Sequence, residues 1–147
     1  PETAYALDQG ALRRFVALSV RARAGLALWA SNEACPQHVM DVVTQDIARL
    51  GREDSEHAMP TIHLLRAGVA NRRGEGNVEE LLRAAISGFD ALGMALHATC
   101  VRWILARRSG SAEAAAELPR AEALMRMQGV AEPARWARVM AAGVSVP

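Results

Sequence analysis

The chain has 147 residues, of which 51% are hydrophobic and 4% aromatic, and its 17 basic and 16 acidic residues leave a net charge of +1. This length fits one domain. The apolar content excludes a disordered chain, the balanced charge argues against nucleic-acid binding, and no apolar run reaches the roughly 18 residues of a membrane span. The 30 alanines and the many arginines favour helix, so the predicted fold class is all-α.

Glycines and prolines divide the chain into helix-length stretches in which apolar residues recur every three or four positions. In the first stretch, Leu12, Phe15 and Leu26 share one face with their neighbours. The predicted helices span about 11–32, 36–50, 56–73, 77–92, 94–108, 112–128 and 133–142. The fifth carries apolar residues on two faces, which predicts a helix sandwiched between neighbours.

Two prolines affect these predictions. Pro60 implies that the third helix begins later than Glu56. Pro119 falls in the middle of the sixth, where an interior proline removes a hydrogen bond and costs about 3 kcal/mol. Either that helix kinks or it begins at Pro119. We favour the kink, because Ala114 and Leu118 continue the apolar stripe.

A shift of 36 residues aligns the chain with itself. The aligned sets are Ala58, Met94 and Val130; Leu65, Val101 and Ala137; Arg66, Arg102 and Arg138; Ala70, Ala106 and Ala142; and, in the partner helices, Gly74 with Gly110, Val78 with Ala114, Leu82 with Leu118, Ala85 with Ala121, Phe89 with Met125 and Gly93 with Gly129. A period of this length with two helices per unit is typical of a helical-hairpin solenoid.

The sequence therefore predicts antiparallel helical hairpins stacked into a short right-handed superhelix. After a lead-in over 1–10, the repeat domain covers 11–147, with hairpins at about 11–51, 55–92 and 94–128 and a closing helix at 132–142. The first hairpin keeps helical spacing but not the 36-residue register.

The helix, glycine turn and helix pattern resembles the tetratricopeptide (TPR) repeat. The resemblance lies in Gly74, Val78, Leu82 and Ala85 and in their equivalents 36 residues later, where that family keeps a turn glycine and a small, a large and a small residue. Two features of the family pattern are missing: glycines stand where the closing proline is kept, and the first helix lacks its aromatic residue.

Longer stretches within 12–143 resemble another group of proteins. They are residues 64–70, 81–94, 125–130, 133–135 and 140–143. These look like the C-terminal segment of large bacterial signalling proteins in which a Ser/Thr protein kinase domain precedes a STAND-type ATPase domain and a TPR-like tail. The resemblance implies that kinase and ATPase motifs lie upstream, and this chain contains neither a P-loop nor the kinase signatures.

Few residues suggest chemistry. His97 and Cys100 are three apart on one predicted helix, a spacing that suits a nucleophile and its base or half a metal site. Because no third ligand or orienting acid follows at helical spacing, we interpret them as a partly buried histidine and an inert core cysteine. We predict no catalytic residue, no metal site and no cofactor. A small helical enzyme or metal protein using this pair remains an alternative, as does a purely structural spacer.

The repeated arginines suggest binding. Arg66, Arg102 and Arg138 would project in a row from successive first helices, which line the concave surface in TPR-like folds, and His63 shares that stripe. Such a row would grip the carboxylates of an acidic peptide. We therefore expect a non-catalytic protein-interaction module with a peptide groove at His63, Arg66, Arg102 and Arg138, and no nucleic-acid or membrane partner.

Two further expectations concern context. Upstream repeats or a second copy would cover an exposed apolar edge around Leu12, Phe15 and Leu26. Cys35 and Cys100 lack the spacing of a disulfide scaffold and fit a reducing compartment, so the expected location is cytoplasmic.

Overall fold

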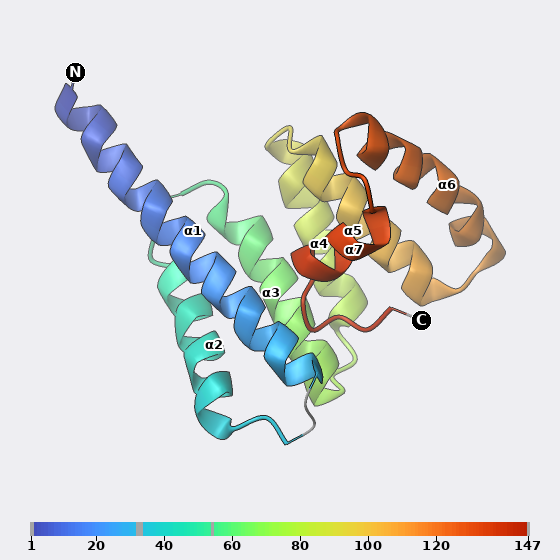
Figure 1. Cartoon of the computed structure of the whole chain (residues 1–147), viewed down its shortest axis with the longest axis horizontal. Coiled ribbons are helices and arrows are strands. Elements are labelled where there is room, and N and C mark those ends of the chain that lie inside the picture. Colours follow the sequence, from blue (N-terminus) through green and yellow to red (C-terminus); the bar gives the residue numbers. More distant parts are fainter. Residues whose placement is uncertain (1, 32–33, 54, 147) are drawn as a thin grey trace.

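The computed structural model describes residues 2–31, 34–53 and 55–146, and over these residues the chain is helical with no strand (Figure 1). The helices are α1 (Glu2–Ser31), α2 (Gln37–Leu50), α3 (Ala58–Arg73), α4 (Val78–Ala91), α5 (Ala95–Ser109), α6 (Ala112–Met127) and α7 (Pro133–Met140). The all-α prediction is confirmed. None of the described helices is both long and apolar enough to cross a membrane.

The helices form stacked hairpins. Helices α1 and α2, α3 and α4, and α5 and α6 pack as neighbouring pairs, and α4 also packs closely on α5 (Figure 1). The short helix α7 turns back onto α5 and also reaches α1 and α6. Helix α5 is therefore enclosed by α4, α6 and α7, as its two apolar faces predict.

The 36-residue register is visible in the turns. Gly93 and Gly129 follow α4 and α6 and have φ angles of 68° and 88°, in the region that favours glycine. In both turns the amide after the glycine donates to the carbonyl five residues earlier, at 2.9 Å and 3.0 Å. This hydrogen bond is that of a Schellman C-cap, so the two hairpins end with the same local geometry.

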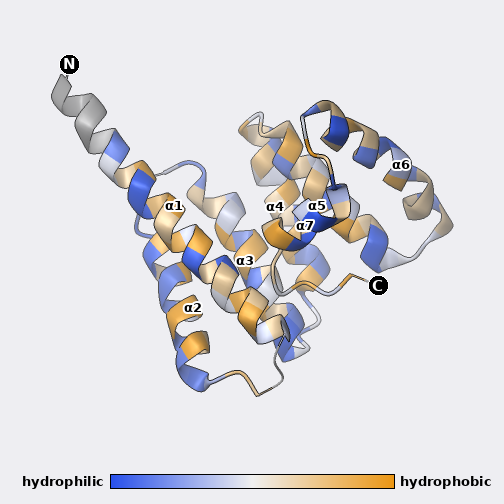
Figure 2. Cartoon of the chain, in the orientation of Figure 1, coloured by the Kyte–Doolittle hydropathy of each residue, from blue (hydrophilic) through white to orange (hydrophobic). Residues whose placement is uncertain are grey.

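The core consists of two clusters. The larger joins the helices from α3 to α7 around Leu82, Phe89 and Ile104, and the smaller joins α1, α2 and α3 around Leu26, Val43 and Ile62. On α2 the apolar residues lie on the side toward α1 (Figure 2). Each hairpin thus buries one stripe internally and leaves the rest for its neighbour.

Three helices bear on the predicted boundaries, and only the start of α1 differs from the favoured prediction. Helix α1 begins at Glu2, so it covers most of the predicted lead-in, and Gly10 lies inside it at a cost of about 1 kcal/mol relative to alanine. Helix α3 begins at Ala58, later than Glu56, with Pro60 in its first turn, where a missing N–H is tolerated. Helix α6 runs continuously through Pro119, so a start at Pro119 is wrong.

The predicted apolar edge is only partly exposed. Leu12 is 55% exposed, and Val16 and Val20 extend its stripe along α1 with similar exposure. Phe15 is half-buried. Assigning Leu26 to this edge is wrong, because the segment after α7 covers it and leaves it fully buried.

Candidate functional site

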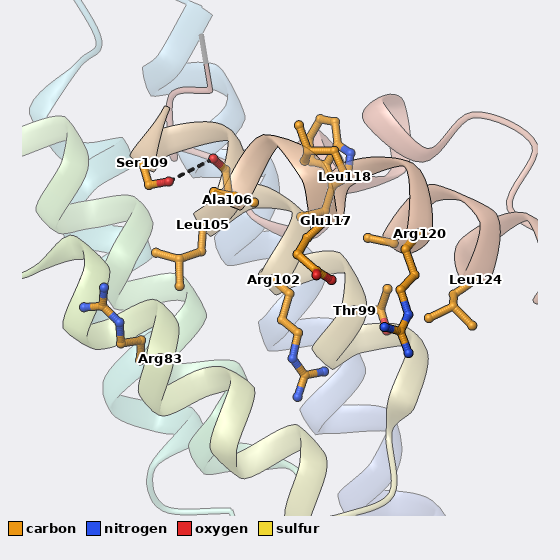
Figure 3. A pocket seen from close by; sticks show the side chains of 13 residues that line it. Arg83, Thr99, Arg102, Leu105, Ala106, Ser109, Glu117, Leu118, Arg120 and Leu124 are labelled. Carbon is orange, nitrogen blue, oxygen red and sulfur yellow. Dashed lines mark hydrogen bonds between the residues drawn. The ribbon is translucent and has the colours of Figure 1, made fainter. Parts of the chain in front are cut away.

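An open groove lies between α5 and α6. It encloses about 520 Å³, and apolar side chains form most of its wall, chiefly Leu105, Leu118, Ala121 and Leu124 (Figure 3). Leu118 and Ala121 are half-buried, whereas the equivalent Leu82 and Ala85 of α4 are fully buried. Part of the stripe that α4 buries completely therefore remains accessible on α6, although Met125, the equivalent of Phe89, is fully buried.

Two departures from the repeat leave this groove open. In the preceding hairpin, Gly88 lets α4 approach Pro60 so closely that a β-carbon at residue 88 would lie 2.8 Å from the proline Cβ. The residue 36 positions later is Leu124. Its side chain prevents an equally close approach of α6 to the preceding helix, and it is 45% exposed at the groove. At the other end of α6, Ala114 replaces the larger Val78. Compared with α4, helix α6 thus carries a bulkier residue at one end and a smaller residue at the other.

Charged residues surround the apolar wall. Arg83 from α4, Arg102 from α5 and Arg120 from α6 line the groove together with Glu117 (Figure 3). Counting only these four charged side chains, the lining carries a net charge of +2.

Two of these arginines have acidic partners outside the groove lining. Arg102 pairs with Asp90, and Arg83 pairs with Glu79 at 2.9 Å. All four side chains in these pairs are more than 40% exposed. Exposed pairs of this kind contribute about 1 kcal/mol or less, so either arginine can exchange its partner at small cost.

The four predicted groove residues do not gather at one site. Arg102 lines the groove between α5 and α6, while Arg138 on α7 lines two other cavities. Arg66 is exposed on α3, close enough to His63 to lower the pKa of that imidazole, although burial is the larger cause. The equivalent arginines do not form a row, because α7, which carries Arg138, turns back onto α5 and does not continue the stack.

The chain's own C-terminal segment, residues 141–146, covers part of the surface formed by α1, α3 and α5. Gly68 on α3 has no side chain where this segment crosses it, and a β-carbon there would meet the Ala142 carbonyl oxygen and Leu26. Ala141, Ala142 and Val144 are buried in this position. We call the surface formed by α1, α3 and α5, the first helices of the hairpins, the inner surface. A peptide bound to the part of it under residues 141–146 would have to displace that segment.

Polar side chains hold the same segment by its backbone. Asn71 donates from Nδ2 to the carbonyl oxygen of Gly143 at 2.8 Å, and Arg108 donates to the carbonyl oxygen of Ser145 at 2.7 Å. Arg108 also donates to the amide oxygen of Asn71 at 2.9 Å, which orients that side chain. Asn71 belongs to no repeated set, so the sequence pattern does not single it out.

Cys100 is fully buried, and His97, three residues earlier on α5, is half-buried. Burial raises the pKa of the Cys100 thiol to about 12, so at neutral pH the thiol is protonated and is a poor nucleophile. Burial, with Arg23 and His57 nearby, lowers the pKa of His97, whose ring packs against Phe89 with centroids 5.2 Å apart. Among the described residues, no three His, Cys, Asp or Glu side chains are grouped to hold a metal ion.

Comparison with known proteins identifies no relative of this chain. No family model, curated protein or solved structure matches it.

Proposed function

We propose that this chain is a non-catalytic protein-interaction module whose groove between α5 and α6 binds an amphipathic helix of a partner protein. The observation that carries the proposal is an open apolar groove surrounded by arginines. A partner helix would place its apolar residues against Leu105, Leu118 and Leu124. Acidic residues beside that stripe would meet Arg83, Arg102 and Arg120. Helix-in-groove recognition of this type reads apolar anchors at helical spacing.

Burial and charge favour this groove over the row of arginines expected on the inner surface. The groove offers apolar area whose burial contributes about 25 cal/mol per Å². The inner surface is partly covered by residues 141–146, and its equivalent arginines diverge. Arg102 belongs to both hypotheses, and we propose that it acts in the groove. The buried, protonated Cys100 makes a thiol-based enzyme a weaker hypothesis.

Selection from a random peptide-display library would test the proposal. We expect selected peptides to be helical, with apolar residues at i, i+3, i+4 and i+7 and Asp or Glu beside them. Arg120→Glu and Leu124→Asp, made separately, should each abolish capture. Met127→Asp is the matched control, because Met127 is 79% exposed on the same helix and does not belong to the groove lining.

Three outcomes would contradict the proposal. The library would yield no enriched peptide, the enriched peptides would be basic, or their binding would survive both groove substitutions. The first outcome favours the spacer hypothesis. If peptides with the expected acidic and amphipathic pattern still bound after both groove substitutions, the partner would occupy another surface.

The resemblance to C-terminal tails of bacterial signalling proteins leads us to propose a regulatory role for this module within a larger kinase or ATPase. Binding of a partner helix between α5 and α6 would then signal the presence of a second protein or recruit that protein. The complete reading frame tests this context. Kinase or P-loop motifs ahead of Pro1 would support it, and a frame without them would refute it.

A further inference from the structure

A further groove, of about 480 Å³, lies between α1 and α7. Its apolar wall consists of Val20, Ala24 and Ala27 on α1 and of Val139 and Ala142 on the opposite side. The two valines are 55% and 57% exposed, so they offer apolar area that a ligand can remove from water. Alanines occupy the other apolar positions, and their methyl groups leave the space between the two helices unfilled.

Three arginines complete the lining, Arg23 from α1 and Arg135 and Arg138 from α7. Arg135 pairs with Glu132 at 3.9 Å, and both side chains are largely exposed. Within the part of the chain that the structure describes, neither Arg23 nor Arg138 forms an ion pair. Two positive charges therefore border the apolar wall without a fixed counter-charge.

Arg23 is the more buried of these two arginines. It is half-buried, and burial lowers the pKa of its guanidinium. The neighbour that acts in the opposite direction is the Cys100 thiol, which is protonated at neutral pH and therefore carries no charge. The buried Nε of Arg23 has no hydrogen-bond partner among the described residues. Because a partly desolvated guanidinium without an acid is unfavourable, an anion would gain more here than at a fully hydrated arginine.

The side chains of the lining offer hydrogen-bond donors and no acceptors. Arginine carries five N–H donors and no acceptor, and the other lining side chains are those of valine and alanine. A ligand with N–H groups, such as an extended peptide, would give up hydrogen bonds to water and find no side-chain acceptor in their place. A hydrocarbon chain that ends in a carboxylate presents acceptors only, and presents them at one end.

We propose that this groove binds an aliphatic carboxylate, the chemical class of the fatty acids. The carboxylate would accept hydrogen bonds from Arg23 and Arg138, since its two oxygens can engage two guanidinium groups. The hydrocarbon chain would lie against Val20, Val139 and the alanines, where the burial of each methylene group contributes to affinity. The groove shares no lining residue with the one between α5 and α6, so this proposal does not depend on the proposed function.

Isothermal titration calorimetry with octanoate, acetate and octan-1-ol would test the proposal. Octanoate carries both the chain and the charge, acetate lacks the chain, and octanol lacks the charge. We expect saturable binding of octanoate and at least tenfold weaker binding of the other two ligands. Lengthening the chain from hexanoate to octanoate should tighten binding, by up to about fourfold for each methylene group that enters the groove.

Two substitutions at exposed positions would locate the site. Arg138→Gln should weaken octanoate binding about tenfold, the loss expected for a hydrogen bond to a charged group. Its control is Arg13→Gln, because Arg13 is exposed on α1 and lies outside the lining. Val139→Asp should abolish binding, since it places a negative charge on the apolar wall. Leu28→Asp should not, because Leu28 is similarly exposed on α1 but does not line the groove.

Four results would overturn the proposal. If octanol bound as tightly as octanoate, the arginines would play no part in binding. If acetate bound as tightly, the apolar wall would play none. The absence of saturable binding at every chain length would exclude this class of ligand. Equal weakening by Arg13→Gln and Arg138→Gln would mean that octanoate responds to general surface charge and not to this groove.

Discussion

Gly68 lies directly against the carbonyl group of Ala142, with no room between them for a β-carbon. Through this contact the C-terminal segment reaches the inner surface of the stack and covers Leu26.

The contact makes a prediction for Gly68→Ala. Alanine improves helix propensity by about 1 kcal/mol, but the new methyl group would overlap a backbone oxygen that cannot rotate away. Overpacking of this kind costs about 1–3 kcal/mol, so we expect a net loss of unfolding free energy in urea denaturation. Gly76→Ala is the control, since nothing lies within 4 Å of its β-carbon. Unchanged stability of Gly68→Ala would mean that the segment is easily displaced.

Asp46 makes a second stability prediction. Its carboxylate is fully buried on α2 and accepts two hydrogen bonds from Arg21 of α1, at 2.6 Å and 2.5 Å. Asp46→Ala should lower the free energy of unfolding by about 1–3 kcal/mol, because it removes a buried hydrogen-bonded partner. Asp41→Ala, on the exposed side of the same helix, should change it by less than about 0.5 kcal/mol. Equal effects in thermal unfolding would contradict this assignment.

Cys100 predicts a loss of stability in alkali. Above about pH 8.5 the thiol of the unfolded chain ionises, whereas the native thiol keeps its proton until its pKa of about 12. The unfolded state then binds fewer protons, so stability falls as the pH rises between these values.

Denaturant titrations from pH 8 to 11 would measure this loss. We expect the decline to be shallower in Cys100→Ala than in the unaltered protein. In Cys35→Ser it should be unchanged, because Cys100 is retained. A decline of the same slope in Cys100→Ala would show that other groups cause it.

His97 predicts a loss of stability in acid. Its native pKa lies below the ordinary 6.5, owing first to burial and then to Arg23 and His57. As the pH falls through 6.5 the unfolded chain therefore takes up a proton before the native protein does, and stability decreases. His97→Gln should reduce the stability lost between pH 7 and 5 in chemical denaturation. The exposed His38, replaced in the same way, should leave the loss unchanged.

The exposed stripe on α1 predicts self-association. Leu12, Val16 and Val20 lie at intervals of four residues and are each about half exposed, which is typical of a surface that packs on another chain or on further repeats. Val16→Glu should lower the sedimentation coefficient measured at high protein concentration. Met59→Glu, an equally exposed position on α3, should not. A monomer at every concentration would restrict this edge to partners other than a second copy.

The repeating features of this chain were predictable from its sequence. Helix-length stretches between glycines, apolar stripes and the register of Gly93 and Gly129 are local properties, since each depends on residues within one or two turns. The all-α hairpin architecture follows from them. The candidate sites depend instead on residues that break the repeat. Leu124 opens a groove where Gly88 closes one, and no local pattern distinguishes these outcomes.

The tertiary structure alone decided where α7 and the residues after it lie. The sequence pattern treats Arg138 as the third member of a row, but α7 folds back and brings it to Arg72 and Arg107. That return depends on long-range contacts, among them Gly68 with Ala142 and Asn71 with Gly143, whose partners are more than 70 residues apart. Helical periodicity determines which face of each helix is apolar, but the choice of the surface that covers it is made only when distant helices pack.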